Sequence, residues 1–190
     1  MTITAKVLNE CGYNEAMLGM SLSYYREGDD LMEWWTPEKL AKAEKRARAL
    51  AFKGGGHNKF LASIFVWAVI RAPRGWWQEY DTYKVATTAN SSSTMHTLSK
   101  QLLNRSNFAE ETDQSQIDLM NKLIAENADI ATLKMNLPEG FLQTRQVCIN
   151  YMTLQNIIKQ RKGHRLKFWN QVIEQIVSQV QHPDLIIESE

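Results

Sequence analysis

The strongest constraint on the fold is a run of apolar, β-branched and aromatic residues from Ile64 to Ile70. This composition is typical of a strand that is buried in a sheet. The run covers about seven residues, whereas a membrane-spanning helix needs about 20 apolar residues. Glycines precede it at Gly54–Gly56, and the segment Arg71–Gly75 is expected to end it. The run therefore predicts the buried strand of a soluble domain.

The bulk composition is that of one globular domain, which we expect to span residues 1–190. Hydrophobic residues make up 44% and charged residues 23% of the chain, unlike the composition of disordered chains. The 22 basic and 21 acidic residues give a formal net charge of +1. A strong basic surplus is the usual mark of proteins that bind nucleic acids or membranes. The overall charge therefore gives no reason to expect either partner, while a local basic patch is compatible with it.

The chain has two cysteines, Cys11 and Cys148, which are far apart in the sequence. This spacing fits neither a zinc site nor a disulfide framework, and no secretory signal precedes them. We interpret them as two small buried thiols in a reducing compartment. The expected localisation is cytoplasmic.

Helices are clearest near the C-terminus. Apolar residues recur at helical spacing at Leu154, Ile157 and Ile158, and again from Trp169 to Val180. A third helix is predicted to begin at Thr36-Pro37-Glu38, where a hydroxyl cap, a proline and a carboxylate follow one another. The lysines and arginines of this third helix are interpreted as a solvated face, and the Gly54–Gly56 run is expected to end it.

Further strands are predicted at Thr2–Leu8 and Thr144–Tyr151. The segment Thr87–Thr94 is rich in serine and threonine, which favour loops and caps, so a loop is predicted there with a helix after it over 94–104. Together these elements predict an α/β (α+β) domain. It should hold a small mixed or antiparallel sheet with several flanking helices and a helix-rich C-terminal half.

Two residues stand out as candidates for chemistry by their positions. Arg161 continues the apolar face of its helix, so it either snorkels to the edge of the core or holds an anion in a partly dry site. His57 follows three glycines and precedes the buried strand, and is either a packing group or a ligand contact. No second histidine or carboxylate stands at metal-ligand spacing from it, so no metal is proposed.

Two segments could contact a ligand. In the segment Arg71–Trp77, one of the two adjacent tryptophans is expected to pack inward, which leaves the other to stack on a base or a flavin ring. The hydroxyls of Ser91–Thr94 would either cap a helix or bind an anion there. Dinucleotide-binding glycine motifs, Walker phosphate loops and hydrolase elbows are absent from the sequence.

The order of these features resembles the flavin-dependent thymidylate synthases. In that family a histidine precedes a buried strand, which leads to the signature R-H-R-x-x-S-x-N-E-x-S-x-R-Y. Later come a leucine-proline turn, an asparagine-led junction from strand to helix, and an arginine that closes that helix. Here the matching residues are His57, the segment Tyr83–His96, Leu137-Pro138, Asn150 and Arg161.

The signature itself departs from the family pattern. Aligned on Asn90, the arginine-histidine-arginine triplet becomes Tyr83-Lys84-Val85, the glutamate becomes Ser91, and the second serine is kept as Ser93. Lys84 could replace one lost positive charge, but as a point charge and not as a bidentate fork. Arg71, Arg74 or Arg145 would have to compensate for the others.

The resemblance implies a pyrimidine nucleotide of the dUMP kind as ligand and FAD as cofactor. Activity would also need methylenetetrahydrofolate as the one-carbon donor. Arg161 and Ser93 would be the catalytic residues, and family members are homotetramers, so a homo-oligomer is expected. The implied site residues are Ser91, Ser93, Arg161 and Arg74 for the nucleotide, and His57, Lys84, Trp77 and Asn150 for the flavin.

Three hypotheses about function stay open. The chain is a divergent flavin-dependent thymidylate synthase-like enzyme, or an inactive descendant that binds a nucleotide or a protein. The third, less favoured hypothesis is a nucleic-acid-binding module. It rests on a basic cluster made of Lys159, Arg161, Lys162, Arg165 and Lys167.

Overall fold

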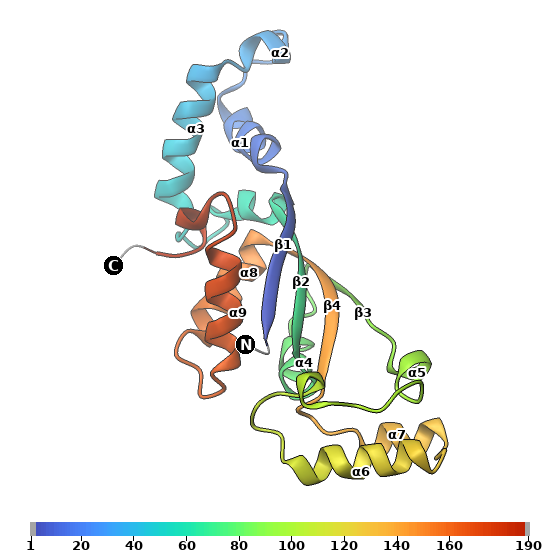
Figure 1. The fold of residues 1–190 in the computed structure, drawn as a ribbon. Coiled ribbons are helices and arrows are strands. Elements are labelled where there is room, and N and C mark those ends of the chain that lie inside the picture. The colour runs from blue at the N-terminus through green and yellow to red at the C-terminus, as the bar shows by residue number, and fades with distance from the viewer. Residues whose placement is uncertain (1–2, 189–190) are drawn as a thin grey trace.

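A computed structural model describes residues 3–188. Four strands form one sheet in which every neighbouring pair is antiparallel, in the order β1-β2-β4-β3 (Figure 1). The strands are β1 (Thr4–Cys11), β2 (Phe65–Pro73), β3 (Thr87–Ser91) and β4 (Leu142–Asn150). The predicted α+β fold with a small sheet and flanking helices is confirmed.

The α-helices flank the sheet and extend beyond both of its ends (Figure 1). In chain order they are α1 (Tyr13–Ser21), α2 (Leu31–Trp34), α3 (Pro37–Leu50), α4 (Arg74–Tyr80), α5 (Thr94–Thr97), α6 (Gln114–Ala125), α7 (Ile130–Asn136), α8 (Tyr151–Arg161) and α9 (Phe168–Val177). Short 3-10 turns cover Leu22–Tyr24, Lys59–Ser63, Arg105–Asn107 and Pro183–Leu185.

The predicted central strand is β2, but only one of its faces is fully buried. Val66, Ala68 and Ile70 are at most 1% exposed and belong to the core formed with α8 and α9. The alternate residues Phe65 and Trp67 are only partly buried. The strand also continues through Arg71 to Pro73, because a proline is tolerated at a strand end.

Helix ends follow the local signals where those signals are strong. Helix α3 begins at Pro37, and α8 begins after Asn150, whose Oδ1 accepts a hydrogen bond from the Thr153 N–H at 2.9 Å. The edge strand β1 is covered by α9, because Gln175 and Gln179 pair with the backbone of Ala5. These side chains satisfy peptide groups that an edge strand leaves unpaired.

The polar segment after Lys84 differs from its prediction. Thr87–Ser91 forms the edge strand β3 and not a loop, because threonine suits an exposed strand that pairs on one side only. The helix predicted over 94–104 is only the short α5. The first predicted strand runs from Thr4 to Cys11, and Thr2 lies outside the described residues.

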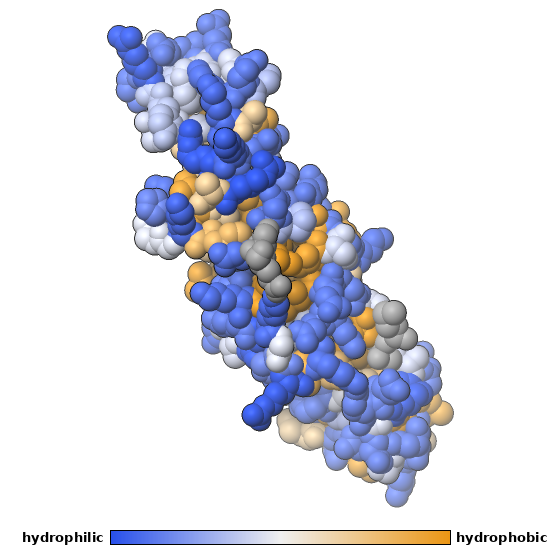
Figure 2. Space-filling model, turned by 90° about the vertical axis from the view of Figure 1, so that its left-hand side faces the viewer, coloured by the Kyte–Doolittle hydropathy of each residue, from blue (hydrophilic) through white to orange (hydrophobic). Residues whose placement is uncertain are grey.

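A second apolar cluster lies at the lower end of Figure 1, where α6 and α7 pack together. Its centre is formed by Leu98, Phe108, Ile117, Met120 and Leu133, separate from the main core around the sheet. Figure 2 shows the resulting elongated shape, with hydrophobic residues visible mainly along the middle. None of the helices within residues 3–188 has the length and apolar character needed to cross a membrane.

Gly12 joins β1 to α1 and requires the absence of a side chain. Its φ of +88° is left-handed, and a Cβ there would lie 2.1 Å from the backbone oxygen of Ser63. We expect Gly12→Ala to lower the free energy of unfolding by at least about 2 kcal/mol, because strain and overlap add. Urea unfolding monitored by circular dichroism measures this loss.

Gly19, in the same helix, provides the control. A Cβ there meets nothing within 4 Å, so Gly19→Ala should stabilise the protein by about 0.5–1 kcal/mol through helix propensity. Equal effects of both substitutions would show that the close approach of Gly12 to Ser63 is not what requires glycine.

Candidate functional site

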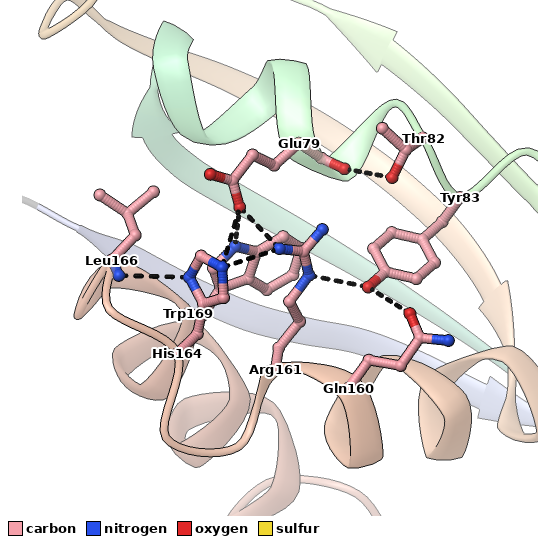
Figure 3. Close-up of polar contacts among 8 residues, drawn as sticks. All are labelled: Glu79, Thr82, Tyr83, Gln160, Arg161, His164, Leu166 and Trp169. Carbon is pink, nitrogen blue, oxygen red and sulfur yellow. Dashed lines mark hydrogen bonds and ion pairs between the residues drawn. The ribbon is translucent and has the colours of Figure 1, made fainter.

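Arg161, the last residue of α8, lies in a polar cluster between α4, α8 and α9 (Figure 3). Its Nη1 is 2.9 Å from Oε2 of Glu79, and its Nε donates to the Tyr83 hydroxyl at 2.8 Å. The side chains of Arg161 and Glu79 are 17% and 35% exposed. Arg161 therefore continues the apolar face of its helix, as predicted. Its guanidinium, however, already forms an ion pair with a carboxylate of the same chain, that of Glu79.

Two further side chains complete this group, which we call the Glu79 cluster: Glu79, Tyr83, Arg161, His164 and Trp169. The Trp169 indole N–H donates to the same Oε2 of Glu79 at 2.7 Å, and the Arg161 guanidinium lies 4.7 Å from the Trp169 ring centroid. His164 Nε2 is 3.1 Å from Arg161 Nη1. One carboxylate oxygen thus holds residues from three helices together.

A second arginine, Arg145 on β4, repeats this arrangement. Its Nη1 is 2.8 Å from Oδ1 of Asp81, and its guanidinium lies 4.4 Å from the ring centroid of Trp77. Arg145 is directly opposite Ser91 in the sheet register, so the two side chains share a face of the sheet. The structure therefore brings Arg145, and not Arg161, next to the serine-rich segment.

The expected meeting of Arg161 with Ser93 does not occur within the chain. Ser93 precedes α5 beyond the end of β3, where Ser92 N donates to Thr144 O at 2.9 Å. The Ser93 side chain makes no capping hydrogen bond. All polar contacts of Arg161 to the described residues lie in the Glu79 cluster, with Glu79, Tyr83 and His164.

Lys84 lines a hollow of about 690 Å³ between α8 and the turn after α4, here called the Lys84 hollow. It is also lined by Phe52, Tyr83, Asn156 and Lys159, and no carboxylate among residues 3–188 lines it. Lys84 and Lys159 are exposed, and neither has an ion-pair partner within residues 3–188. Uncompensated cations, aromatic rings and an amide suit a ligand that combines anionic and ring groups.

His57 lines a neighbouring hollow of about 620 Å³, the His57 hollow, together with Glu15, Ser23 and Lys59. The glycine loop before His57 separates the two hollows, because Gly54 lines the first while Gly55 and Gly56 line the second. Gly55 and Gly56 have φ values of +70° and +83°, which only glycine adopts without strain. The loop therefore presents His57 to solvent.

Three other predicted ligand residues have structural roles in the chain. Trp77 is fully buried and donates to Gln143 O at 2.9 Å, and Trp76 is buried as well, so neither indole has an exposed face for a flavin. Both amide ends of Asn150 are engaged, with Thr153 N and Ala62 O. Arg74 donates to Leu137 O at 2.7 Å.

The basic cluster proposed for nucleic acids is divided by the fold. Arg161 is paired with Glu79, and Lys167 Nζ is 2.6 Å from Oε1 of Glu111. The Lys167 contact lowers the pKa of the Glu111 carboxyl. Lys159 faces the Lys84 hollow instead. The residues therefore do not present one continuous cationic surface.

Sequence reasoning missed the acidic partners, Glu79 and Asp81. The sequence gives little sign that these two residues pair with arginines, because carboxylates at the end of a short helix usually lie in solvent. Within the described part of the chain no group of three or more histidine, cysteine or acidic side chains could hold a metal ion. Burial raises the pKa of the Cys148 thiol, so this cysteine is a poor nucleophile.

Solved structures resemble this one along nearly its whole length. A flavin-dependent thymidylate synthase ThyX from Helicobacter pylori, complexed with FAD and dUMP, matches with a TM-score of 0.77 and 16% identity over 98% of both chains. A second crystal structure of ThyX from the same organism, also with FAD and dUMP, matches with a TM-score of 0.76 and 15% identity over 97% of both chains.

The UMP/dUMP methylase PolB from Streptomyces cacaoi, bound with 5-Br dUMP, is also similar. Its TM-score is 0.68 at 11% identity, over 93% of this chain and 88% of that chain. No protein-family profile and no curated protein sequence matches the chain. The predicted resemblance to flavin-dependent thymidylate synthases is thus confirmed at the level of the fold.

Glu79→Gln tests how far the fold depends on the Glu79 cluster. We expect the free energy of unfolding to fall by about 1–3 kcal/mol, because the guanidinium loses its partly buried counter-charge. The urea midpoint at an unchanged m-value measures the loss.

The matched control is Glu111→Gln, which removes the same charge from the exposed pair with Lys167, whose side chains are 48% and 65% exposed. That change should stay within about 0.5 kcal/mol. Equal losses in both variants would contradict a special role for Glu79.

Proposed function

We propose that the chain binds a pyrimidine nucleotide of the dUMP kind together with FAD. One observation carries the proposal: a fold shared with enzymes solved with FAD and dUMP has, in this chain, a hollow lined by two unpaired lysines and two aromatic rings. Both lysines can neutralise phosphate oxygens, while the rings of Phe52 and Tyr83 offer apolar surface to a base or a flavin.

The residues of the two hollows fit FAD by their chemistry. Lys84 and Lys159 would hold its diphosphate, the Asn156 amide can donate to and accept from a ring edge, and His57 borders the adjoining hollow. Flavin supplies hydride transfer when it is bound. The protein's own contribution is to orient the nucleotide and to offer donors to its carbonyl and phosphate oxygens.

In this proposal Arg161 and Ser93 contact the nucleotide, and the Glu79 cluster limits what Arg161 can do. Its Nε and Nη1 are already engaged with Tyr83 and Glu79, so Nη2 is the donor left for a ligand. Ser93 has a hydroxyl that caps no helix. Since these two residues do not meet within one chain, a shared site would need a second copy to bring them together.

Self-association therefore forms part of the proposal, with a homotetramer as the expected assembly. The sheet face that carries Phe65, Trp67 and Cys148 is only partly buried by the described residues. Both cysteines are free thiols, but Cys11 is exposed and Cys148 is only partly buried, so the prediction of two buried thiols is wrong. Free thiols persist in a reducing compartment, so the proposed location is the cytoplasm. Light scattering after size exclusion would give the oligomeric state.

If the protein is active, it transfers a one-carbon unit from methylenetetrahydrofolate to the nucleotide. The alternative is an inactive descendant that binds a nucleotide or a protein without turnover. A specific observation favours it: Arg161 and Arg145 are both paired with carboxylates of the same chain, so neither guanidinium brings net charge to a phosphate. Formation of thymidylate from dUMP with FAD, NADPH and methylenetetrahydrofolate separates the two.

The test of binding is an absorption spectrum of the protein after incubation with FAD and removal of free ligand. The wild type should retain the flavin bands. Lys84→Gln and Lys159→Gln should each weaken FAD binding at least about tenfold, because each loses a charge-assisted contact to phosphate.

Lys100→Gln serves as the control, since Lys100 is an exposed lysine outside both hollows. It should bind FAD like the wild type. A colourless protein whose Tm responds to neither FAD nor dUMP would reject the proposal.

A further inference from the structure

A separate cationic pocket lies at the far end of the molecule, where α1, α2 and α3 meet at the top of Figure 1. It measures about 210 Å³ and is lined by Ser21, Tyr24, Trp34, Lys39, Lys42 and Arg46. We call it the Arg46 pocket. It shares no lining residue with the Lys84 hollow or the His57 hollow.

Helix α3 supplies all three cations of this pocket. Lys39, Lys42 and Arg46 are spaced by three and four residues, so they lie on one face of the helix. Ala43 and Ala47 are at most 1% exposed, so this side of α3 packs against the core. This part of the basic helix is therefore not the simple solvated face that the sequence predicts.

Aromatic rings fix two of these cations in position. The Arg46 guanidinium lies 4.2 Å from the ring centroid of Tyr24, and the Lys39 ammonium lies 4.1 Å from that of Trp34. The Lys39 Nζ also donates to Trp34 O at 2.5 Å. A guanidinium stacked on a ring keeps its in-plane N–H groups free to donate. The rings thus position both charges, and the stacking of Arg46 on Tyr24 satisfies none of the guanidinium N–H groups.

One donor of the pocket is left without an acceptor. Arg46 Nη1 is buried and has no hydrogen-bond partner among residues 3–188, and no carboxylate within that range forms an ion pair with Lys39, Lys42 or Arg46. Glu38 precedes Lys42 by one turn but does not line the pocket. A buried donor without a partner in a native structure calls for an explanation, and a bound acceptor is the simplest one.

We propose that the Arg46 pocket binds a phosphate group of a small soluble phosphorylated compound, such as a phosphate monoester or a diphosphate. Three cations without a carboxylate select an oxyanion, and the planar guanidinium matches the spacing of two phosphate oxygens. The volume is below the roughly 300 Å³ at which drug-sized ligand sites begin. The pocket therefore takes one or two phosphate groups and not a whole dinucleotide or a nucleic-acid strand.

Calorimetric titration with inorganic phosphate and pyrophosphate tests this site directly. Wild-type protein should bind pyrophosphate, and Arg46→Gln and Lys42→Gln should each weaken this binding at least about tenfold, as expected for the loss of a charge-assisted contact. Lys45→Gln, an exposed lysine of the same helix that does not line the pocket, is the matched control and should bind normally.

The variant Lys84→Gln keeps this test independent of the proposed nucleotide site. Loss of pyrophosphate binding in Lys84→Gln with normal binding in Arg46→Gln would overturn the proposal, as would the absence of any heat with the wild type. A stronger, steeply salt-dependent interaction with single-stranded oligonucleotides than with pyrophosphate would also overturn it, since that is the behaviour of a nucleic-acid surface.

Thermal unfolding of Arg46→Met distinguishes a binding role from a packing role. Methionine can still pack on Tyr24 but removes the unpartnered donor, so the Tm without ligand should stay the same or rise while the pyrophosphate-induced shift is lost. A lower Tm with the ligand-induced shift intact would show that Arg46 serves the fold instead.

Discussion

A single carboxylate oxygen connects the helical layer of this protein. Oε2 of Glu79 accepts from Arg161 on α8 and from Trp169 on α9, while Glu79 itself belongs to α4. These helices approach from different places: α4 follows β2, α8 follows β4, and α9 covers the edge of β1. Because the pair is partly dry, removing one member would leave an uncompensated charge, which costs more than the pair contributes net. The same contact therefore positions the helices and sets the charge of Arg161.

This constraint changes how an anion could be held. In a site built from unpaired arginines, a phosphate gains bidentate hydrogen bonds from a planar fork. Here Arg161 and Arg145 each face a carboxylate of the same chain, so a phosphate would compete with Glu79 or Asp81. The cations without an ion-pair partner among residues 3–188 that line the Lys84 hollow are Lys84 and Lys159. Exposed ammonium groups act as point charges that salt screens effectively, so ligand affinity there should depend strongly on ionic strength.

The parts of the fold that could be predicted are those whose cause is local. The helix-start signal at Thr36-Pro37 and the apolar stripe of α9 depend on residues within a few turns of one another, and both helices form where expected, although the Thr36 side chain makes no capping hydrogen bond. Strand β3 was missed because its residues pair only with β4, which lies 54 to 62 positions later in the sequence, from Ser91 opposite Arg145 to Thr87 opposite Ile149. The local polarity of the segment gives no sign of that partner. The apolar run of β2 likewise carries no information about which of its faces the helices cover.

In the candidate site, too, features with a local cause could be predicted, and contacts between residues distant in sequence could not. The sequence places Arg161 on the apolar side of α8, and the structure agrees, but Glu79 lies 82 residues earlier in the chain and no spacing rule connects the two. The burial of Trp77 depends on Gln143 and Arg145 of a distant strand. His57 was found because it follows a run of glycines, and such breaks are where loops expose side chains. Lys84 was singled out only through the resemblance to the family signature, in which it takes the place of a lost positive charge. Contacts that are distant in sequence decide whether a predicted residue is free to meet a ligand.

Although the net charge of the chain is close to zero, cations without an ion-pair partner gather at two separate places among residues 3–188, the Lys84 hollow and the Arg46 pocket. At the Lys84 hollow and at the Arg46 pocket, lysine or arginine lies beside tyrosine or tryptophan with no ion-pair partner among residues 3–188, whereas Arg145 and Arg161 are paired with carboxylates. Keeping like charges together raises the free energy of the folded state through repulsion. Such an arrangement is stable only if packing elsewhere offsets it, and a bound anion lowers it directly. Since the two cationic regions share no lining residue, an anion bound at one of them would not relieve the repulsion at the other.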